Sequence, residues 1–311
     1  MEVRQIGSSG LWVSSVGLGC NNLGSRIDER QATAVVNAAL AAGITHFDTA
    51  ESYGAGESES ILGRALGSKR DQVVIATKFA PRPRDERYTA GSLRERIFAG
   101  CDGSLKRLGT DHIDLYYQHR PDPVAPVEEA LEALSELVAA GKVAHIACSN
   151  FSAGQIDEAA RVAATAGLRA YAASQIHWNL LFRAEEVAHV PAVRRHHMSI
   201  IPYFPLESGL LTGKYRPDRY PEGSRLTKAP RFGELATEEN FVYIERLKHS
   251  AEERGRSLLD LAFGWLLAQE GVPSVIAGAT TPEQVAQNVK AGQAWHLTPA
   301  ELEGLPEKEP R

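Results

Sequence analysis

Asp48 and Tyr53 are the residues whose types and spacing first suggest chemistry. Asp48 directly follows the apolar segment Ile44–Phe47, and Tyr53 comes five positions later in a polar stretch. A carboxylate at a strand end and a phenol on the following loop can face one cavity, which suits proton transfer. An aspartate after a strand also commonly serves as a cap or turn residue, so this pair alone does not define a site.

Lys78 and His119 follow the next two apolar segments and extend this pair. An unpaired buried ammonium is costly, so a buried Lys78 requires an anionic partner, and Asp48 is the expected one. An ammonium close to Tyr53 should lower the phenol pKa from its ordinary value of roughly 10. His119 would then hydrogen-bond the oxygen that receives the tyrosine proton. A surface lysine and a core histidine are the structural alternatives, and the convergence of four such residues favours catalysis.

The elements that must position these residues repeat one unit, in which an apolar strand and a polar loop precede an amphipathic helix ending at glycine. Glycine just past a helix favours the left-handed conformation that closes the last turn. Eight strands alternating with helices predict a parallel sheet covered on its outside, closed into a (β/α)8 TIM barrel. The predicted strands are Val16–Gly19, Ile44–Phe47, Val73–Ala76, Ile113–Tyr117, Val143–Cys148, Ala170–Ser174, Ser199–Pro202 and Ser274–Ala277.

Three segments depart from the repeated unit. Residues 2–13 predict an N-terminal β-hairpin, residues 256–270 an extra helix, and residues 208–238 a long loop of the kind that usually serves function. No composition shift marks a linker, so residues 1–311 are expected to form a single domain. A doubly wound open sheet is disfavoured because Gly17–Gly24 lacks the three-glycine spacing of a phosphate-binding turn.

The composition excludes several classes of function. The 311 residues carry a net charge of −5 and no basic run, so nucleic acid is not an expected partner. No apolar run reaches membrane-spanning length, and the N-terminus has no apolar signal region, so a membrane role is not expected and the cytoplasm is the expected location. Three cysteines without metal-ligand spacing fit a reducing compartment and predict no metal site.

The C-terminal ends of barrel strands converge on one mouth. The residues that follow the predicted strands there are polar, aromatic or glycine: Asp48 and Tyr53, Lys78, His119, Ser149 and Asn150, Gln175, Tyr203, and Gly278. They lie in the motifs Phe47-Asp48-Thr49-Ala50 with Tyr53-Gly54, Ala76-Thr77-Lys78, Asp114–His119, Cys148–Phe151, Tyr203–Tyr215, and Gly278–Gln284 with Asn288. These motifs resemble those of the aldo-keto reductase superfamily, and the resemblance runs from about Val3 to Pro299.

The resemblance implies an oxidoreductase that reduces aldehydes or ketones with NADPH or NADH. Its catalytic tetrad would be Tyr53 as general acid, Lys78 and Asp48 as the groups that tune it, and His119 as the group that orients the substrate. Cofactor contacts would come from Ser149, Asn150 and Gln175 around the carboxamide, Tyr203 stacked on the nicotinamide, and a loop over the pyrophosphate that includes Leu206, Gly209, Lys214 and Arg225.

The cofactor preference depends on the last strand and helix. Some relatives carry a lysine and an arginine at the positions of Gly278 and Gln284, where they contact the 2′-phosphate, and this chain has neither. Other branches of the family bind NADPH with residues like Thr280, Gln284 and Asn288. NADPH is therefore the expected cofactor, and NADH remains possible.

The substrate pocket implied by the resemblance includes Asn21, Trp178 and Phe204. Asn21 replaces a tryptophan and Trp178 a tyrosine that many members have. The C-terminal tail from Leu297 offers little apolar surface, so the mouth should be wide and suit a small polar carbonyl compound. Alternatively, the amides of Asn21 and its neighbour Asn22 hydrogen-bond the loop backbone.

Three alternatives belong to other classes. A cofactor-binding regulatory or redox-sensing subunit would turn over poorly, and relatives of that type often alter the His119 position. A Schiff-base aldolase would use Lys78. A metal-dependent hydrolase would use Asp48 and His119 with His145 and His177, but the sequence contains neither HxH nor HExxH spacing.

Overall fold

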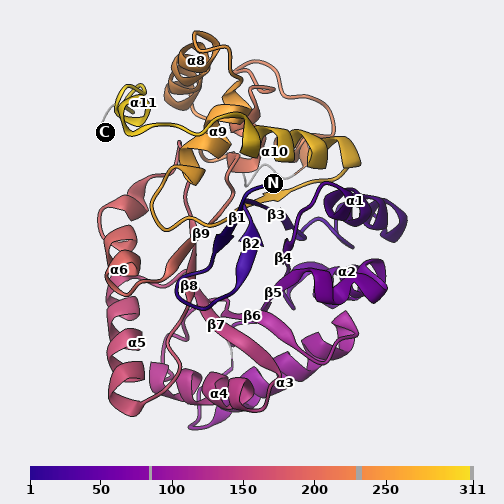
Figure 1. Cartoon of the computed structure of the whole chain (residues 1–311), viewed down its shortest axis with the longest axis vertical. Coiled ribbons are helices and arrows are strands. Elements are labelled where there is room, and N and C mark those ends of the chain that lie inside the picture. Colours follow the sequence, from indigo (N-terminus) through magenta and orange to yellow (C-terminus); the bar gives the residue numbers. More distant parts are fainter. Residues whose placement is uncertain (84–85, 229–232, 309–311) are drawn as a thin grey trace.

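A ring of parallel strands surrounded by helices forms the body of the protein (Figure 1). The computed structural model describes residues 1–83, 86–228 and 233–308. Within these residues eight strands pair in the order β10-β3-β4-β5-β6-β7-β8-β9, and β9 and β10 come into contact so that the sheet nearly closes. This confirms the predicted (β/α)8 barrel. The strands are β3 (Val16–Gly19), β4 (His46–Asp48), β5 (Val74–Phe79), β6 (Ile113–Gln118), β7 (Val143–Ser149), β8 (Ala173–His177), β9 (Ser199–Tyr203) and β10 (Val275–Gly278).

The helices that cover the ring begin and end at residues suited to those positions. Asp28 caps α1 and Ser152 caps α5, each in a capping box with a glutamine three residues later. Gly109 and Gly167 take the left-handed conformation just past α3 and α5. The covering helices are α1 (Glu29–Ala41), α2 (Glu57–Leu66), α3 (Ser92–Leu108), α4 (Val127–Ala139), α5 (Ala153–Ala166), α6 (His189–Arg195) and α10 (Pro282–Ala294).

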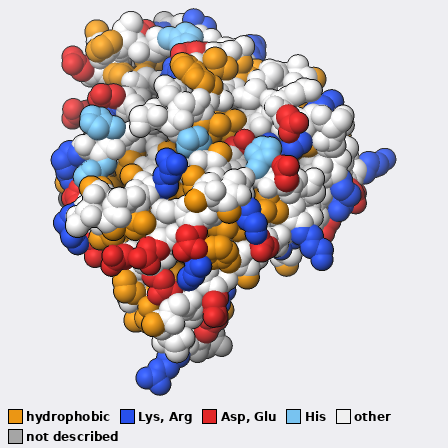
Figure 2. Space-filling model, turned by 60° about the horizontal axis from the view of Figure 1, so that its bottom comes forward, with side chains coloured by type: hydrophobic (Ala, Val, Ile, Leu, Met, Phe, Trp, Pro, Cys, Tyr) orange, Lys and Arg blue, Asp and Glu red, His pale blue; other side chains and the backbone are white. Residues whose placement is uncertain are grey.

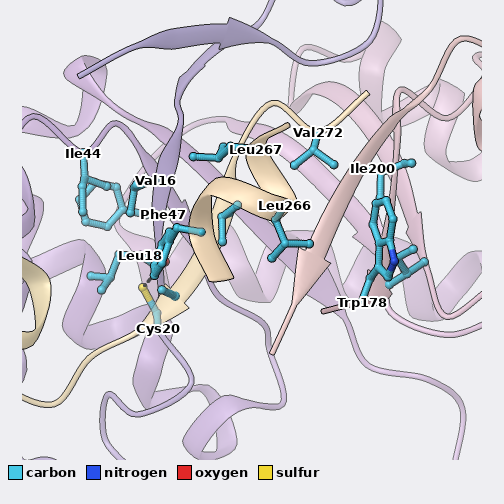
Figure 3. Close-up of a cluster of buried hydrophobic side chains, with 14 of the residues drawn as sticks. Val16, Leu18, Cys20, Ile44, Phe47, Trp178, Ile200, Leu266, Leu267 and Val272 are labelled. Atoms are coloured by element: carbon cyan, nitrogen blue, oxygen red, sulfur yellow. Dashed lines mark hydrogen bonds between the residues drawn. The ribbon is translucent and has the colours of Figure 1, made fainter. Parts of the chain in front are cut away.

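Alternation along the strands divides the core into two parts. Side chains at alternate positions, such as Val74 and Ala76 of β5, point into the barrel and form the inner cluster. The intervening residues, such as Ile75, pack outward beneath the helices. Figure 3 shows this outer core, where Phe47 of β4 and Ile200 of β9 lie on either side of α9 (Leu258–Leu267).

The N-terminal hairpin closes one end of the barrel. Strands β1 (Val3–Gln5) and β2 (Trp12–Ser14) pair antiparallel and cross the ring in Figure 1. Ile6 and Val13 are fully buried and belong to the inner cluster. The hairpin therefore covers the end opposite the loops that follow the strands, which leaves those loops to form the open end.

The segment before the last strand contains two helices beyond the repeated unit, in agreement with a barrel that has one or more extra helices. The predicted helix at 256–270 is α9, and a second additional helix, α8 (Glu238–Glu252), precedes it. Residues 208–238 are not one irregular loop, because they include most of η4 (Glu207–Thr212) and the short α7 (Arg225–Lys228). Positions 229–232 of this predicted loop lie outside the described residues. Beyond β10 and α10, the tail adds the short helix α11 (Pro299–Glu303).

The surface carries mixed charge. Figure 2 shows positive, negative and apolar side chains interspersed over one face of the molecule. Within the described ranges no helix combines the length and apolar character needed to span a bilayer.

Candidate active site

The strand register brings the predicted site residues to one end of the barrel. Asp48 pairs with Gly19 of β3 and with Ala76 of β5, so it lies one layer below Lys78. Ser149 pairs with Gln175, and Gly278 pairs with Gly19. These residues lie at or near the C-terminal ends of their strands, and their side chains therefore surround the open end.

Lys78 and Asp48 form a buried ion pair there. The Lys78 Nζ atom lies 2.7 Å from Asp48 Oδ1 and also donates to the Thr49 carbonyl oxygen at 2.7 Å. The second carboxylate oxygen accepts a hydrogen bond of 2.8 Å from Gln175 Nε2. Burial alone would lower the Lys78 pKa, but the Asp48 charge and the interactions with Asp48 and Tyr53 raise it above its ordinary value. The ammonium is therefore held protonated beneath the site, paired as the sequence predicts.

Tyr53 lies over this ammonium, with its ring centroid 5.2 Å from Lys78 Nζ. The expectation that Lys78 lowers the Tyr53 pKa is wrong for the net shift. Burial raises the Tyr53 pKa, the Lys78 charge acts in the opposite direction, and the result is a pKa above the ordinary value. The phenol therefore keeps its proton at neutral pH, as a proton donor must.

His119 meets Tyr53 edge to face, with the ring centroids 6.1 Å apart and the planes at 82°. Burial, together with the positive charges of Lys78 and Arg120, lowers the His119 pKa to about 3. The imidazole is neutral at pH 7, and its Nδ1 atom has no hydrogen-bond partner among the residues that the structure describes. His119 is therefore not a core histidine satisfied by the backbone.

Tyr117 is a site residue that the sequence reasoning missed. Its side chain is fully buried, and its ring centroid lies 5.6 Å from Lys78 Nζ. Tyr117 precedes His119 by two positions, and strand alternation places such residues on the same face. The two-residue spacing from His119 is therefore the pattern in the sequence that points to Tyr117. Two aromatic rings, of Tyr53 and Tyr117, contact the ammonium.

A network of amides and hydroxyls joins the ends of β7, β8 and β9. Asn150 Nδ2 donates to the His119 carbonyl oxygen and to Ser149 Oγ, both at 3.0 Å. Ser149 Oγ donates to the Gln175 carbonyl oxygen at 3.0 Å. Tyr203 donates its hydroxyl to Asn150 Oδ1 at 2.9 Å. The four residues expected to hold the nicotinamide end of a cofactor are thus brought together beside His119.

The segment after β9 supplies the cationic part of the candidate site. Lys214 is exposed, with Nζ 5.2 Å from the Tyr215 ring centroid. The Arg225 guanidinium lies 5.1 Å from the ring centroid of Phe204, which contacts Tyr203 edge to face. Leu206 and Gly209 lie between these groups in sequence. The structure therefore brings Arg225 to the predicted cofactor loop from a separate helix.

The N-terminal end of α10 holds the residues considered for cofactor preference. Gln284 Oε1 accepts from the Thr280 backbone N–H at 2.8 Å and from its hydroxyl at 3.1 Å. Asn288 is buried one turn further on, and Gly278 is exposed at the end of β10. Thr280 and Gln284 therefore hydrogen-bond each other in this conformation.

The residues predicted for the substrate pocket lie in different environments. Phe204 and Asn21 are half-buried at the open end. Trp178 is 1% exposed, packs against Trp265, and donates its indole N–H to Glu186 at 3.0 Å. Figure 3 shows Trp178 within the outer hydrophobic core. Its indole is therefore not available to a ligand in this conformation.

Asn22 illustrates the alternative considered for the two asparagines. Its side-chain amide is buried and donates to the Ala279 carbonyl oxygen at 3.2 Å. The amide of Asn22 therefore hydrogen-bonds the backbone of the loop after β10. Asn21 lies beside Gly278, where a β-carbon added to the glycine would be 3.5 Å from Asn21 Oδ1.

Metal ligands do not gather in the part of the chain that the structure describes, because no group of three or more His, Cys, Asp or Glu side chains converges there. His145 lies within β7 and His177 at the end of β8. The site thus combines a neutral phenol, a buried ammonium–carboxylate pair and a neutral imidazole, a set suited to donating one proton to an oxygen.

Comparisons with known proteins identify a matching family and several relatives of this chain. Residues 15–309 match the model of the aldo/keto reductase family. The chain is 37% identical to aldo-keto reductase YhdN of Bacillus subtilis, over 92% of this chain and 87% of the relative. It is 32% identical to L-glyceraldehyde 3-phosphate reductase of Escherichia coli, over 94% and 87%. It is also 36% identical to a probable voltage-gated potassium channel subunit beta of Oryza sativa, over 94% and 91%.

Proposed function

Because this chain belongs to the aldo/keto reductase family, we propose that Tyr53 is the proton donor of an NAD(P)H-dependent carbonyl reductase. Reduction of aldehydes or ketones to alcohols with a nicotinamide cofactor is the activity that the family supports. The observation that carries the assignment of Tyr53 is the buried Lys78–Asp48 pair beneath its ring. Turnover of a generic aldehyde with each cofactor tests the activity, and its absence would contradict the proposal.

The residues present fit a nicotinamide cofactor. The Tyr203 ring and the amides of Asn150 and Gln175 would hold the nicotinamide end, since a planar ring and amide groups match its shape and its carboxamide. Lys214 and Arg225 would hold the phosphates, and Ser208 Oγ, which is buried without a hydrogen-bond partner among the described residues, lies on the same segment. When bound, the reduced nicotinamide supplies the hydride that reaches the carbonyl carbon.

The protein side chains would complete the reaction by moving one proton. His119, neutral at pH 7, would hydrogen-bond the carbonyl oxygen and orient it toward Tyr53. Tyr53 would donate its hydroxyl proton to that oxygen as negative charge develops. The Lys78 ammonium would stabilise the phenolate left behind, and solvent would return the proton. Asp48 would act through Lys78, because it keeps the ammonium charged in a buried position.

NADPH is the proposed cofactor. Lys214 and Arg225 add positive charge along the segment proposed to cover the phosphates, and Thr280, Gln284 and Asn288 are polar side chains near the start of α10. Dissociation constants for NADPH and NADH, measured by quenching of tryptophan fluorescence, test the preference. Tighter binding of NADH would overturn it.

The proposed substrates are small polar carbonyl compounds. Asn21 places an amide at the open end, and buried amides favour ligands that can hydrogen-bond them over apolar ones. The E. coli relative is named for glyceraldehyde 3-phosphate, which is also small and polar. Comparing kcat/KM for a small dicarbonyl, an aldose and a steroid ketone tests this specificity, and a steroid preference would contradict it.

A regulatory cofactor-binding subunit is the second candidate, because the rice relative is named as a potassium channel subunit. The presence of Tyr53, Lys78, Asp48 and His119 in one cluster favours catalysis. Steady turnover with NADPH separates the two functions, since a sensor subunit would bind the cofactor and reduce aldehyde poorly.

The three free buried cysteines fit a reducing compartment, and we infer the cytoplasm as the site of action.

A further inference from the structure

His177 lies outside the proposed catalytic set, yet it stacks on two aromatic rings at the open end. Its ring is parallel to that of Phe182, with centroids 4.1 Å apart and planes at 4°. It also stacks on Tyr203 at 5.4 Å and 16°. Phe204 contacts both His177 and Tyr203 edge to face. One face of the Tyr203 ring is therefore occupied by His177.

Glu207 holds the His177 ring in this stack. Glu207 Oε2 lies 2.5 Å from His177 Nε2 and accepts a hydrogen bond of 2.7 Å from Asn179 Nδ2. Asn179 also donates to the Phe204 carbonyl oxygen at 2.9 Å and accepts from the Phe182 backbone N–H at 3.0 Å. Glu207 is 5% exposed and Asn179 fully buried. The imidazole thus has a fixed edge as well as two stacked aromatic neighbours.

The segment that carries Glu207 has an unusual backbone. Phe204, Glu207 and Ser208 all have positive φ, at 53°, 41° and 56°. Non-glycine residues rarely adopt this left-handed region, and they remain there only when their surroundings determine the conformation. The bonds from His177 and Asn179 to Glu207, and from Asn179 to Phe204, supply such surroundings. The stack and the strained segment are therefore one connected unit.

Tyr203 is also restrained by the network of amides and hydroxyls that joins the ends of β7, β8 and β9. Its hydroxyl donates to Asn150 Oδ1, and Asn150 bonds the His119 carbonyl oxygen. Asn150 fixes the hydroxyl end of the ring, whereas His177 fixes its plane. We propose that His177, held by Glu207 and Asn179, is a positioning residue that sets the plane of Tyr203 against the nicotinamide end of the cofactor. This inference rests on the proposed function, in which Tyr203 stacks on the nicotinamide.

Two ligands distinguish positioning from a merely structural role. NADPH contains the nicotinamide ring, whereas 2′,5′-ADP shares its adenosine, its 2′-phosphate and one of its two 5′-phosphates and lacks the nicotinamide riboside. His177→Ala should weaken NADPH binding by about two- to tenfold, as expected for loss of an aromatic contact, and leave 2′,5′-ADP binding within about twofold. The rate of hydride transfer in a single turnover should fall as well. His177→Phe, which keeps a ring in the stack, should recover part of both losses.

Glu207→Gln and His196→Ala complete the design. Glu207→Gln keeps the size of the side chain and removes its charge, so it should change NADPH binding in the same direction and to a smaller extent. The Glu207→Gln variant also tests the positioning role if His177→Ala fails to fold. His196→Ala removes a similar histidine–carboxylate contact, to Asp157 at 2.8 Å on the outside of the barrel, and should change neither ligand.

The outcomes separate this inference from the proposed function. Equal weakening of NADPH and 2′,5′-ADP, or unchanged NADPH binding and hydride transfer in the His177 and Glu207 variants, would overturn the positioning role. If Tyr203→Ala weakens NADPH selectively while the His177 variants do not, only the inference fails. If Tyr203→Ala leaves NADPH binding unchanged, the assigned cofactor site fails and the inference fails with it.

Discussion

At the scale of single residues, the site depends on opposed effects of burial and charge. Burial disfavours the charged form of Lys78, and Asp48 and Tyr53 together more than compensate for it. At Tyr53 the balance is reversed, because burial outweighs the nearby ammonium and raises the pKa. The outcome is a charged lysine beneath a neutral phenol. Removing either charge of the buried pair should therefore disturb both the reaction and the fold.

Asp48→Asn tests this dependence. Asparagine keeps the size of the side chain but not its charge, so the Lys78 pKa should fall toward the value that burial favours. We expect a loss of about 10²-fold in the single-turnover rate, within the range of general acid catalysis, with cofactor affinity changed much less. Breaking a buried pair should also lower the free energy of unfolding by about 3–5 kcal/mol. Rapid-mixing kinetics and urea unfolding measure the two effects, and near-normal values of both would refute the role of the pair.

Part of the site could be predicted from the sequence, and the rest required coordinates. The pairing of Lys78 with Asp48 follows from chemistry, because a buried ammonium needs an anion. The net pKa shift of Tyr53 does not, since it depends on how deeply the hydroxyl is buried. Trp178 was assigned to the substrate pocket by position, but its indole turns outward into the core against Trp265. Glu207 joins His177 only through the left-handed turn after Tyr203, which no pattern in the sequence indicates.

At the scale of elements, helix α2 approaches α3 more closely than any side chain larger than hydrogen would allow. A β-carbon added at Gly63 of α2 would lie 2.2 Å from the carbonyl oxygen of Leu108, the last residue of α3. The obstructing atom belongs to the backbone and cannot rotate away. Close contact between these helices supports the strands β4 and β5, which carry Asp48 and Lys78.

Gly63→Ala should therefore destabilise the protein by forcing the two helices apart. Overpacking typically costs about 1–3 kcal/mol, and a chain of 311 residues should lose about 1.5 °C of Tm per kcal/mol. Gly154→Ala is the matched control, because a β-carbon at Gly154 of α5 meets no atom within 4 Å. The control should be neutral or stabilising by up to about 1 kcal/mol. Calorimetry measures the melting temperatures of both variants. Equal melting temperatures would contradict the close approach of α2 and α3 at Gly63.

Periodicity in the sequence predicts which elements exist better than where they begin. The eight strands were all expected, but β8 begins three residues later than predicted, at Ala173. Helix α8 was not expected, although Phe241, Ile244, Leu247 and Ala251 recur at helical spacing and are buried. Its frequent charged residues concealed this stripe. Glycine, proline and basic residues dominate the stretch before α8, and this composition predicts a loop.

At the scale of the whole molecule, buried histidines should make stability depend on pH. Burial lowers the pKa of His46 to about 4, of His119 to about 3 and of His189 to about 4, from an ordinary value of 6.5. Between pH 6.5 and 4 the unfolded chain binds protons that the folded protein does not. Stability is therefore greatest above pH 6.5 and falls as the pH falls through this window.

His46→Gln measures one of these contributions. Removing the histidine should reduce the slope of unfolding free energy against pH by up to about 1.4 kcal/mol per pH unit between pH 6 and 4.5. His249→Gln, at an exposed position on α8, is the control for removal of a surface histidine. Urea unfolding at several pH values provides the data. An identical slope in wild type and His46→Gln would show that His46 is protonated in the folded protein.

The proposal that Tyr53 donates the proton is tested most directly by Tyr53→Phe, which removes a single oxygen atom. The ring remains to pack over Lys78, so the NADPH dissociation constant should stay within about twofold, since cofactor binding does not use the hydroxyl. The single-turnover rate of aldehyde reduction should fall by about 10²–10⁴-fold, the usual contribution of general acid catalysis. A rate near that of the wild type, with NADPH still bound, would contradict the assignment.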